Sequence, residues 1–219
     1  EEERSVEAIV NWVNKKTGPS TVSLKADEVE AFVKKASQET NGAIVVGYFT
    51  TKDSAFFKNF LNASDVAEEF TFVDVVGAAA DKLKLFREHI GETNVEVDAP
   101  ASAEALVSYI KENGYSLVDE VNAKTFARFA AANVPLAVAF VNVSDAESKK
   151  TIVGLLRSVA PEFKGKFNFG FSDGVMYGEQ LEMMGGNKEK LPGIAAMNME
   201  ARKNYPFDGE LNAEALKKW

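Results

Sequence analysis

Short apolar runs alternate with amphipathic segments along the chain. Residues 43–51 and 136–143 are almost continuously apolar and are bounded by polar residues, a pattern that predicts strands buried on both faces of a sheet. Each run is followed by an amphipathic stretch, residues 53–70 or 145–163, whose apolar positions recur at helical spacing. Strands that alternate with helices in this way predict a parallel sheet covered by helices.

The two halves of the chain repeat one order of predicted elements. Each half reads as strand, helix, strand, helix, strand, a variable link, two strands and a closing helix. We expect the two late strands to add antiparallel neighbours at one side of the sheet. The predicted fold class is therefore α/β, with two tandem domains that each hold a mixed central sheet flanked by helices. The other predicted strands are residues 21–26, 71–77, 116–121 and 167–174, and the other helices include residues 27–40 and 123–133.

Three segments share one pattern at the start of a helix. Residues 102–109 read SAEALVSY, residues 212–219 read NAEALKKW and residues 5–12 read SVEAIVNW. In each segment Ser or Asn can cap a helix, Glu lies in the first turn where the helix dipole favours it, and an aromatic residue follows seven positions after the cap. Residues 1–18 thus read as the closing helix of a further unit, and we expect a domain upstream of residue 1.

Composition and charge narrow the class of protein. The chain has 219 residues, 46% hydrophobic and 26% charged, which is typical of a globular protein with room for two domains of about 100 residues. A net charge of -8 disfavours a nucleic-acid partner, and no run approaches the ~18 apolar residues that a membrane helix needs. Residues 116–219 carry 13 charges of each sign, so the acidic excess lies in residues 1–115. We expect neither a nucleic-acid nor a membrane partner.

The chain contains no cysteine and a single histidine, His89. The lack of thiols excludes disulfides, thiolate metal sites and thiol catalysis within this chain. His89 has no second histidine near it in the sequence, so we interpret it as a surface residue rather than a metal ligand. The sequence therefore predicts no catalytic residue, no metal and no cofactor.

Three stretches carry a resemblance to a known family. They are IVNWVNKKTGPSTVSL at residues 9–24, VVGYFTTKDSAFFKNFLNAS at residues 45–64, and EFKGKFNFGFSD at residues 162–173 with the later LPGIAAMN. The order of elements resembles the thioredoxin fold, and the three stretches are similar to the non-catalytic b and b′ domains of the protein disulfide isomerase family. The resemblance implies two tandem thioredoxin-like domains and a location in the lumen of the endoplasmic reticulum. It makes residues 1–18 the last helix of a catalytic domain, residues 19–115 a b domain and residues 116–219 a b′ domain.

The resemblance implies a function in substrate binding. Such a b–b′ fragment binds unfolded or misfolded polypeptides through a hydrophobic cleft in b′ and spaces the catalytic domains of its parent chain during oxidative folding. The first unit has little room for a third helix and no proline before its fourth strand, whereas the second keeps residues 177–184 and Pro192, whose counterpart is usually cis beside the cleft. The expected substrate-binding residues are Leu117, Val121, Phe126, Phe129, Val138, Phe140, Met183, Met184 and Pro192.

Other interpretations of these residues stay open. All five methionines fall within residues 176–199, where their flexible side chains suit varied apolar partners but also fill cores. The second unit could also dock an acidic lectin-chaperone arm through Lys149, Lys150 and Arg157. An acidic calcium-storage protein of the lumen is the other alternative, although 25 basic residues nearly offset the 33 acidic ones. Asn62 and Asn142 begin Asn-x-Ser sequons for N-glycosylation.

Overall fold

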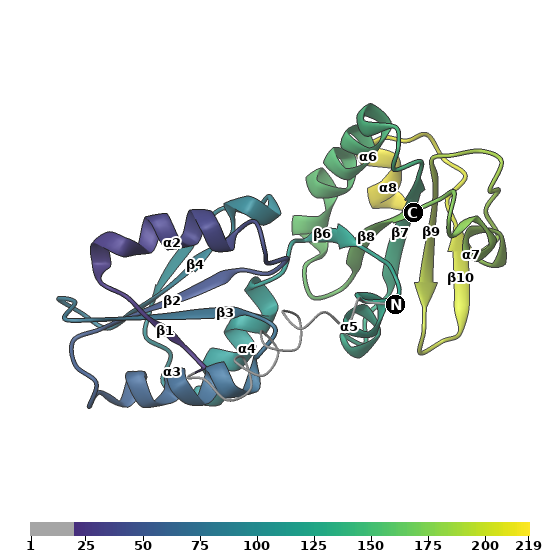
Figure 1. The fold of residues 1–219 in the computed structure, drawn as a ribbon. Coiled ribbons are helices and arrows are strands. Elements are labelled where there is room, and N and C mark those ends of the chain that lie inside the picture. The colour runs from purple at the N-terminus through teal and green to yellow at the C-terminus, as the bar shows by residue number, and fades with distance from the viewer. Residues whose placement is uncertain (1–19) are drawn as a thin grey trace, which may run out of the picture. The chain divides into compact units, whose positions relative to one another are not determined.

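The computed structural model describes residues 20–219, which fall into two compact units (Figure 1). The first unit ends at Ser116 and the second begins at Leu117. The helix that the sequence predicts at residues 5–18 lies outside the described residues. Within the described part, no helix combines the length and the apolar character needed to cross a membrane.

The first unit is built on a five-stranded mixed sheet in the order β1-β3-β2-β4-β5. β1, β3 and β2 run parallel, while β4 and β5 are antiparallel additions at one side, as the sequence predicts. β2 is buried along almost its whole length because helices cover both of its faces. The strands are β1 (Val22–Ser23), β2 (Ile44–Phe49), β3 (Thr71–Val76), β4 (Lys82–Phe86) and β5 (Val95–Asp98).

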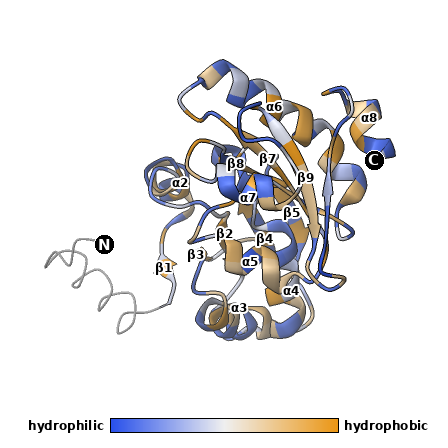
Figure 2. Ribbon diagram, turned by 90° about the vertical axis from the view of Figure 1, so that its right-hand side faces the viewer, coloured by the Kyte–Doolittle hydropathy of each residue, from blue (hydrophilic) through white to orange (hydrophobic). Residues whose placement is uncertain are grey.

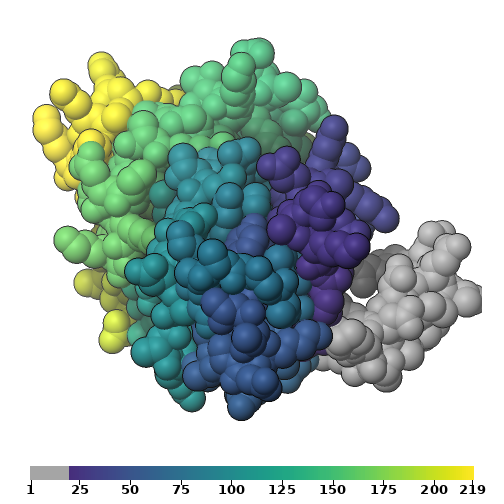
Figure 3. All heavy atoms as spheres, turned by 90° about the vertical axis from the view of Figure 1, so that its left-hand side faces the viewer, coloured from purple at the N-terminus to yellow at the C-terminus, as the bar shows by residue number. Residues whose placement is uncertain are grey.

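Helices cover the two faces of this sheet unequally. α3 (Ala55–Val66) and α4 (Ala103–Asn113) bury a phenylalanine-rich core on one face, in which the ring centroids of Phe49 and Phe60 lie 5.1 Å apart. The other face is covered by α2 (Val29–Ala36; purple in Figure 3), which follows the short helix η1 (Ala26–Glu28) and presents its charged residues to solvent. Residues 77–81 lead directly from β3 to β4. The expected lack of a third helix in the first unit is confirmed.

The second unit repeats this plan with a sheet in the order β10-β9-β7-β8-β6. β6, β8 and β7 are parallel, and β9 and β10 continue the sheet antiparallel. Every residue of β7 is buried, which confirms the strand predicted from its continuous apolar run. The strands are β6 (Val118–Glu120), β7 (Leu136–Val141), β8 (Asn168–Asp173), β9 (Gly193–Asn198) and β10 (Lys203–Pro206).

Two helices lie on each face of the second sheet. α6 (Ala146–Val159), which continues into η3 (Ala160–Phe163), packs with α8 (Ala213–Lys218) on one face. α5 (Phe126–Ala131) and α7 (Gly178–Met183) cover the other face. The hydrophobic residues gather in the strands and on the inner sides of the helices, orange in Figure 2, because burial removes apolar surface from water.

The repeated helix starts are confirmed in both described copies. The Ser102 hydroxyl accepts a hydrogen bond from the Ala105 amide at 3.2 Å, and the Asn212 side chain accepts one from Ala215 at 2.9 Å. The aromatic residue that follows each cap contacts its own unit: Tyr109 packs against the phenylalanine-rich core of the first unit, whereas Trp219 is 42% exposed and its ring lies 5.3 Å from that of Phe207.

Candidate functional site

The candidate site is the face of the second sheet that α5 and α7 cover. Side chains from β7, from both helices and from the end of β6 form one apolar cluster there. Five of the nine expected binding residues belong to this cluster: Val121, Phe129, Val138, Phe140 and Met184. The structure therefore brings these five together, but as buried residues, so they form the support of a surface rather than its open lining.

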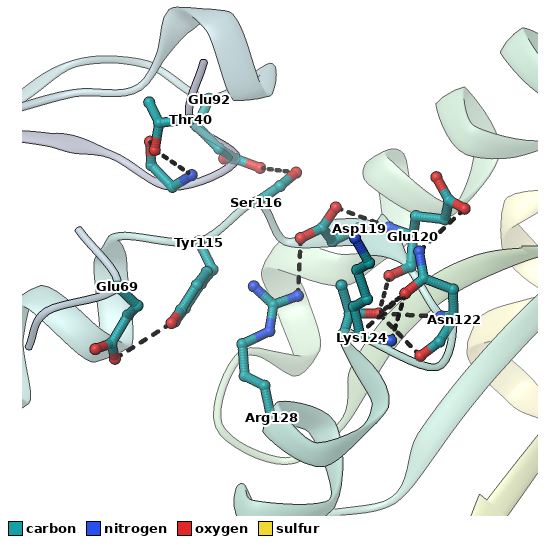
Figure 4. Close-up of polar contacts among 12 residues, drawn as sticks. Thr40, Glu69, Glu92, Tyr115, Ser116, Asp119, Glu120, Asn122, Lys124 and Arg128 are labelled. Atoms are coloured by element: carbon teal, nitrogen blue, oxygen red, sulfur yellow. Dashed lines mark hydrogen bonds and ion pairs between the residues drawn. The ribbon is translucent and has the colours of Figure 1, made fainter. Parts of the chain in front are cut away.

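A hydrogen-bonded turn after β6 positions α5. The Asn122 side-chain oxygen accepts from the Lys124 amide at 2.9 Å, and the Thr125 hydroxyl donates to the Glu120 carbonyl at 2.6 Å. These bonds occupy residues 122–125 in the turn (Figure 4), so α5 begins only at Phe126. The helix is shorter at both ends than the predicted residues 123–133.

An ion pair holds α5 against the strand that precedes it. Arg128 and Asp119 form an ion pair (Figure 4) with Nη2 2.8 Å from Oδ2, and both side chains are about three-quarters buried. The Arg128 guanidinium also lies over the Phe129 ring, 4.7 Å from its centroid. Because Phe129 inserts into the core at the same turn, the ion pair and the ring together fix the orientation of α5.

The start of α7 is held by the turn that follows β8. The Asp173 side chain accepts hydrogen bonds from the amides of Val175 at 2.9 Å and Met176 at 3.3 Å. Beyond the helix, Lys188 reaches back to Glu179 at 2.6 Å and Glu182 at 3.0 Å. Hydrogen bonds to these two carboxylates raise the pKa of Lys188 above its usual value.

The exposed apolar side chains of this region are those that could meet a ligand. Phe126 on α5 is 40% exposed and Met183 on α7 is 71% exposed, although their neighbours Phe129 and Met184 are buried. The turn before α7 adds Val175 and Met176, which are equally exposed. We did not expect Val175 in the site; its signal in the sequence is an apolar pair between Asp173–Gly174 and Tyr177.

Leu117 and Pro192 lie apart from the other expected residues. Leu117 packs against the opposite core, beneath α6 and α8, because it precedes β6 and does not follow the alternation of the strand. The Leu191–Pro192 peptide bond is cis, as the resemblance implies. Leu191 packs on the cluster under α7, but Pro192 lines a cavity of about 580 Å³ beside α6, together with Ile152, Leu155 and Leu211.

The basic residues considered for chaperone docking have different surroundings. The Lys149 ammonium lies over the Phe171 ring, 4.6 Å from its centroid, so this side chain is partly engaged within the unit. Lys150 and Arg157 are exposed on α6.

Among its described residues, the first unit has no counterpart of α7, and its surface around β4, β5 and α2 is polar. Lys82 and Glu96 form an ion pair of 2.8 Å across β4 and β5, and a cavity of about 640 Å³ beside α2 is lined mainly by polar side chains. His89 belongs to this lining and is half-buried, with Nε2 2.9 Å from the Gly42 carbonyl oxygen. His89 is thus partly buried and within hydrogen-bonding distance of the backbone, unlike a fully exposed surface histidine. Within residues 20–219, no three acidic or histidine side chains are grouped to hold a metal ion.

Residues 49–219 match the family of thioredoxin-like domains. The chain belongs to this family. Over 218 residues it is 27% identical to a protein disulfide-isomerase of Arthroderma benhamiae, covering 94% of this chain and 40% of that protein. It is also 27% identical over 227 residues to the protein disulfide-isomerase of Oryctolagus cuniculus, covering 97% of this chain and 43% of that protein. The chain thus spans about two fifths of these relatives.

The thioredoxin-like fold is also seen in a solved structure. The crystal structure described as the bb fragment of ERp72 superposes with a TM-score of 0.69 at 16% identity, covering 92% of this chain and 95% of that one. At this identity the likeness shows the fold alone. Together with the relatives, it confirms the prediction of non-catalytic thioredoxin-like domains of the protein disulfide isomerase family. The chain has no cysteine and so none of the thiols that disulfide exchange requires.

Proposed function

We propose that this chain is the non-catalytic, substrate-binding b–b′ part of a protein disulfide isomerase of the endoplasmic reticulum lumen. The first unit corresponds to b, and the second, as b′, binds unfolded polypeptides through the exposed apolar surface of α5, α7 and the turn before α7. The pair spaces the catalytic domains of the parent protein during oxidative folding. The observation that carries this proposal is that Phe126, Met176 and Met183 are exposed on or beside the helices that cover a well-packed apolar cluster.

The chemistry of the exposed residues suits a partner without a defined sequence. Methionine is flexible and polarizable, so Met176 and Met183 can adapt to dissimilar apolar side chains. Large apolar side chains left exposed at the surface can mark interaction sites. The exposed set is Phe126, Val175, Met176 and Met183.

Buried and exposed residues have different roles on the same two helices. Phe129 and Met184 anchor α5 and α7 to the sheet, and the Arg128–Asp119 ion pair fixes the outer turn of α5. The helices therefore present Phe126 and Met183 from a supported surface. We expect binding to be weak, roughly micromolar to millimolar, because a disordered ligand and mobile methionines both lose conformational entropy on association.

A peptide titration followed by NMR tests the proposal. An unfolded peptide rich in Leu and Phe should shift the amide signals of α5, of α7 and of residues 175–176, and leave those of the first unit unchanged. Phe126→Ser and Met183→Ser should each weaken binding by about 1 kcal/mol, roughly fivefold in Kd, because each removes exposed apolar area.

The control variant is Val66→Ser, which changes an exposed apolar residue of α3 in the first unit. It should leave the peptide affinity unchanged. Unaltered affinity in both Phe126→Ser and Met183→Ser, or peptide-induced shifts confined to the first unit, would contradict the proposed site.

A further inference from the structure

The loop that follows β7 contains a modification sequon in a defined conformation. Asn142, Val143 and Ser144 match the Asn-x-Ser pattern, and the Asn142 and Ser144 side chains are exposed. The Asn142 side-chain oxygen accepts a hydrogen bond from the Ser144 amide at 3.0 Å, and its carbonyl accepts one from Asp145, also at 3.0 Å. Asn142 thus forms an Asx turn just before α6.

We propose that Asn142 is the site of an N-linked glycan, transferred from a lipid diphosphate-linked oligosaccharide. In the transfer, the Asn142 side-chain nitrogen bonds to the first sugar carbon, the bond from that carbon to the phosphate oxygen breaks, and the lipid diphosphate leaves. The side-chain nitrogen loses one proton to a base of the transferase. The inference requires the secretory-pathway location that is part of the proposed function.

The geometry of the loop leaves the reacting group available. The Asx turn uses the side-chain oxygen of Asn142, while its nitrogen Nδ2 has no hydrogen-bond partner among residues 20–219. The turn closes within three residues, so it does not depend on the rest of the fold. A glycan on the exposed Asn142 side chain would extend into solvent without displacing any residue of the core.

The second sequon, at Asn62, lies within a helix, and its serine is buried. Asn62 lies inside α3, where residues two positions apart point to different sides of the helix. Ser64 is only 2% exposed, and its hydroxyl oxygen lies 2.7 Å from the Leu61 carbonyl and 2.6 Å from the Ser20 hydroxyl. In this helix Asn62 cannot form the Asx turn with Ser64, so we infer that Asn142 is modified and Asn62 is not.

Secretion of the chain from a eukaryotic host, behind an added leader, tests this inference. The intact mass is measured before and after digestion with a peptide N-glycosidase, and the modified peptide is located by fragmentation. We expect one glycan, on the peptide that contains Asn142. Asn142→Gln and Ser144→Ala should each remove it, whereas Asn62→Gln should leave the mass of the attached glycan unchanged.

Ser144→Thr serves as the matched control, because threonine keeps the hydroxyl that the sequon needs. This variant should remain glycosylated, and circular dichroism should show that Ser144→Ala is folded. Secreted protein with no glycan would overturn the inference, and a glycan at Asn62 would overturn the choice between the sequons. The added leader directs export, so these outcomes are independent of whether the unglycosylated chain binds peptide in the NMR titration.

Discussion

Phe126 and Phe129 lie one turn apart on α5, yet their surroundings differ. Phe129 is 6% exposed and packs with Val138 and Met184, whereas Phe126 is 40% exposed. Phe129→Ala should lower the free energy of unfolding of the second unit by about 3–5 kcal/mol, since it leaves a cavity in a packed core. Phe126→Ala should lower it by less than about 1 kcal/mol.

Urea denaturation followed by circular dichroism and tryptophan fluorescence measures both variants under the same conditions. Phe126→Ala is the internal control for Phe129→Ala, because it removes the same side chain from the same helix. Equal destabilisation by the two variants would show that Phe126 contributes to the core as much as Phe129 does.

Residue spacing alone could not separate these roles. Positions three apart on a helix face the same side, so the sequence placed Phe126 and Phe129 together. α5 has only six residues, and its short length leaves Phe126 at the first turn, beyond the edge of the cluster. Met183 and Met184 are adjacent in the chain, yet Met183 is exposed and Met184 is buried, because successive helix residues point about 100° apart.

At the scale of elements, a side-chain contact links the end of β2 to the start of β4. Asp81 accepts hydrogen bonds from the Thr50 amide at 2.7 Å and from the Thr50 hydroxyl at 3.0 Å. The bond from the Thr50 amide is the main cause that lowers the pKa of Asp81 below its usual value. The contact therefore stabilises the direct β3–β4 connection that replaces a helix in the first unit.

This lowered pKa sets the direction of a pH effect. A carboxylate with a lowered pKa contributes its stability above the unfolded value of about 4 and loses it as the pH falls through the folded value. Asp81→Asn should therefore reduce the free energy of unfolding at pH 7 by up to about 1 kcal/mol, a small effect because the group is partly solvated. Urea denaturation at pH 7 and at about pH 2 measures the difference.

The two pH values provide the control for Asp81→Asn. As the pH falls through the folded pKa of Asp81, the native carboxyl becomes protonated, so the stabilities of the variant and the unchanged protein should converge toward the lower pH. A difference of equal size at both pH values would mean that the charge of Asp81 does not contribute.

At the scale of the whole molecule, each unit has its own sheet and its own buried clusters. Neither unit contains a thiol, because the chain has no cysteine. The purified chain should consequently show no thiol–disulfide exchange in a reductase or isomerase assay, since the thiolate is the nucleophile of that reaction. A complete protein disulfide isomerase serves as the positive control, and turnover that persists after repurification would contradict the expectation.

The order of strands and helices, the twofold repeat and the lack of thiol chemistry followed from the sequence by itself. Local hydrophobic patterns, caps such as Ser102 and composition are properties of short stretches of chain, so they can be recognised without the fold. Only the tertiary structure decided that Phe129 and Met184 are buried, that Leu117 faces the opposite core and that Thr50 binds Asp81. These outcomes depend on which distant segments pack together across the sheet. The exposure of a side chain is set by those tertiary neighbours and not by its neighbours in the sequence.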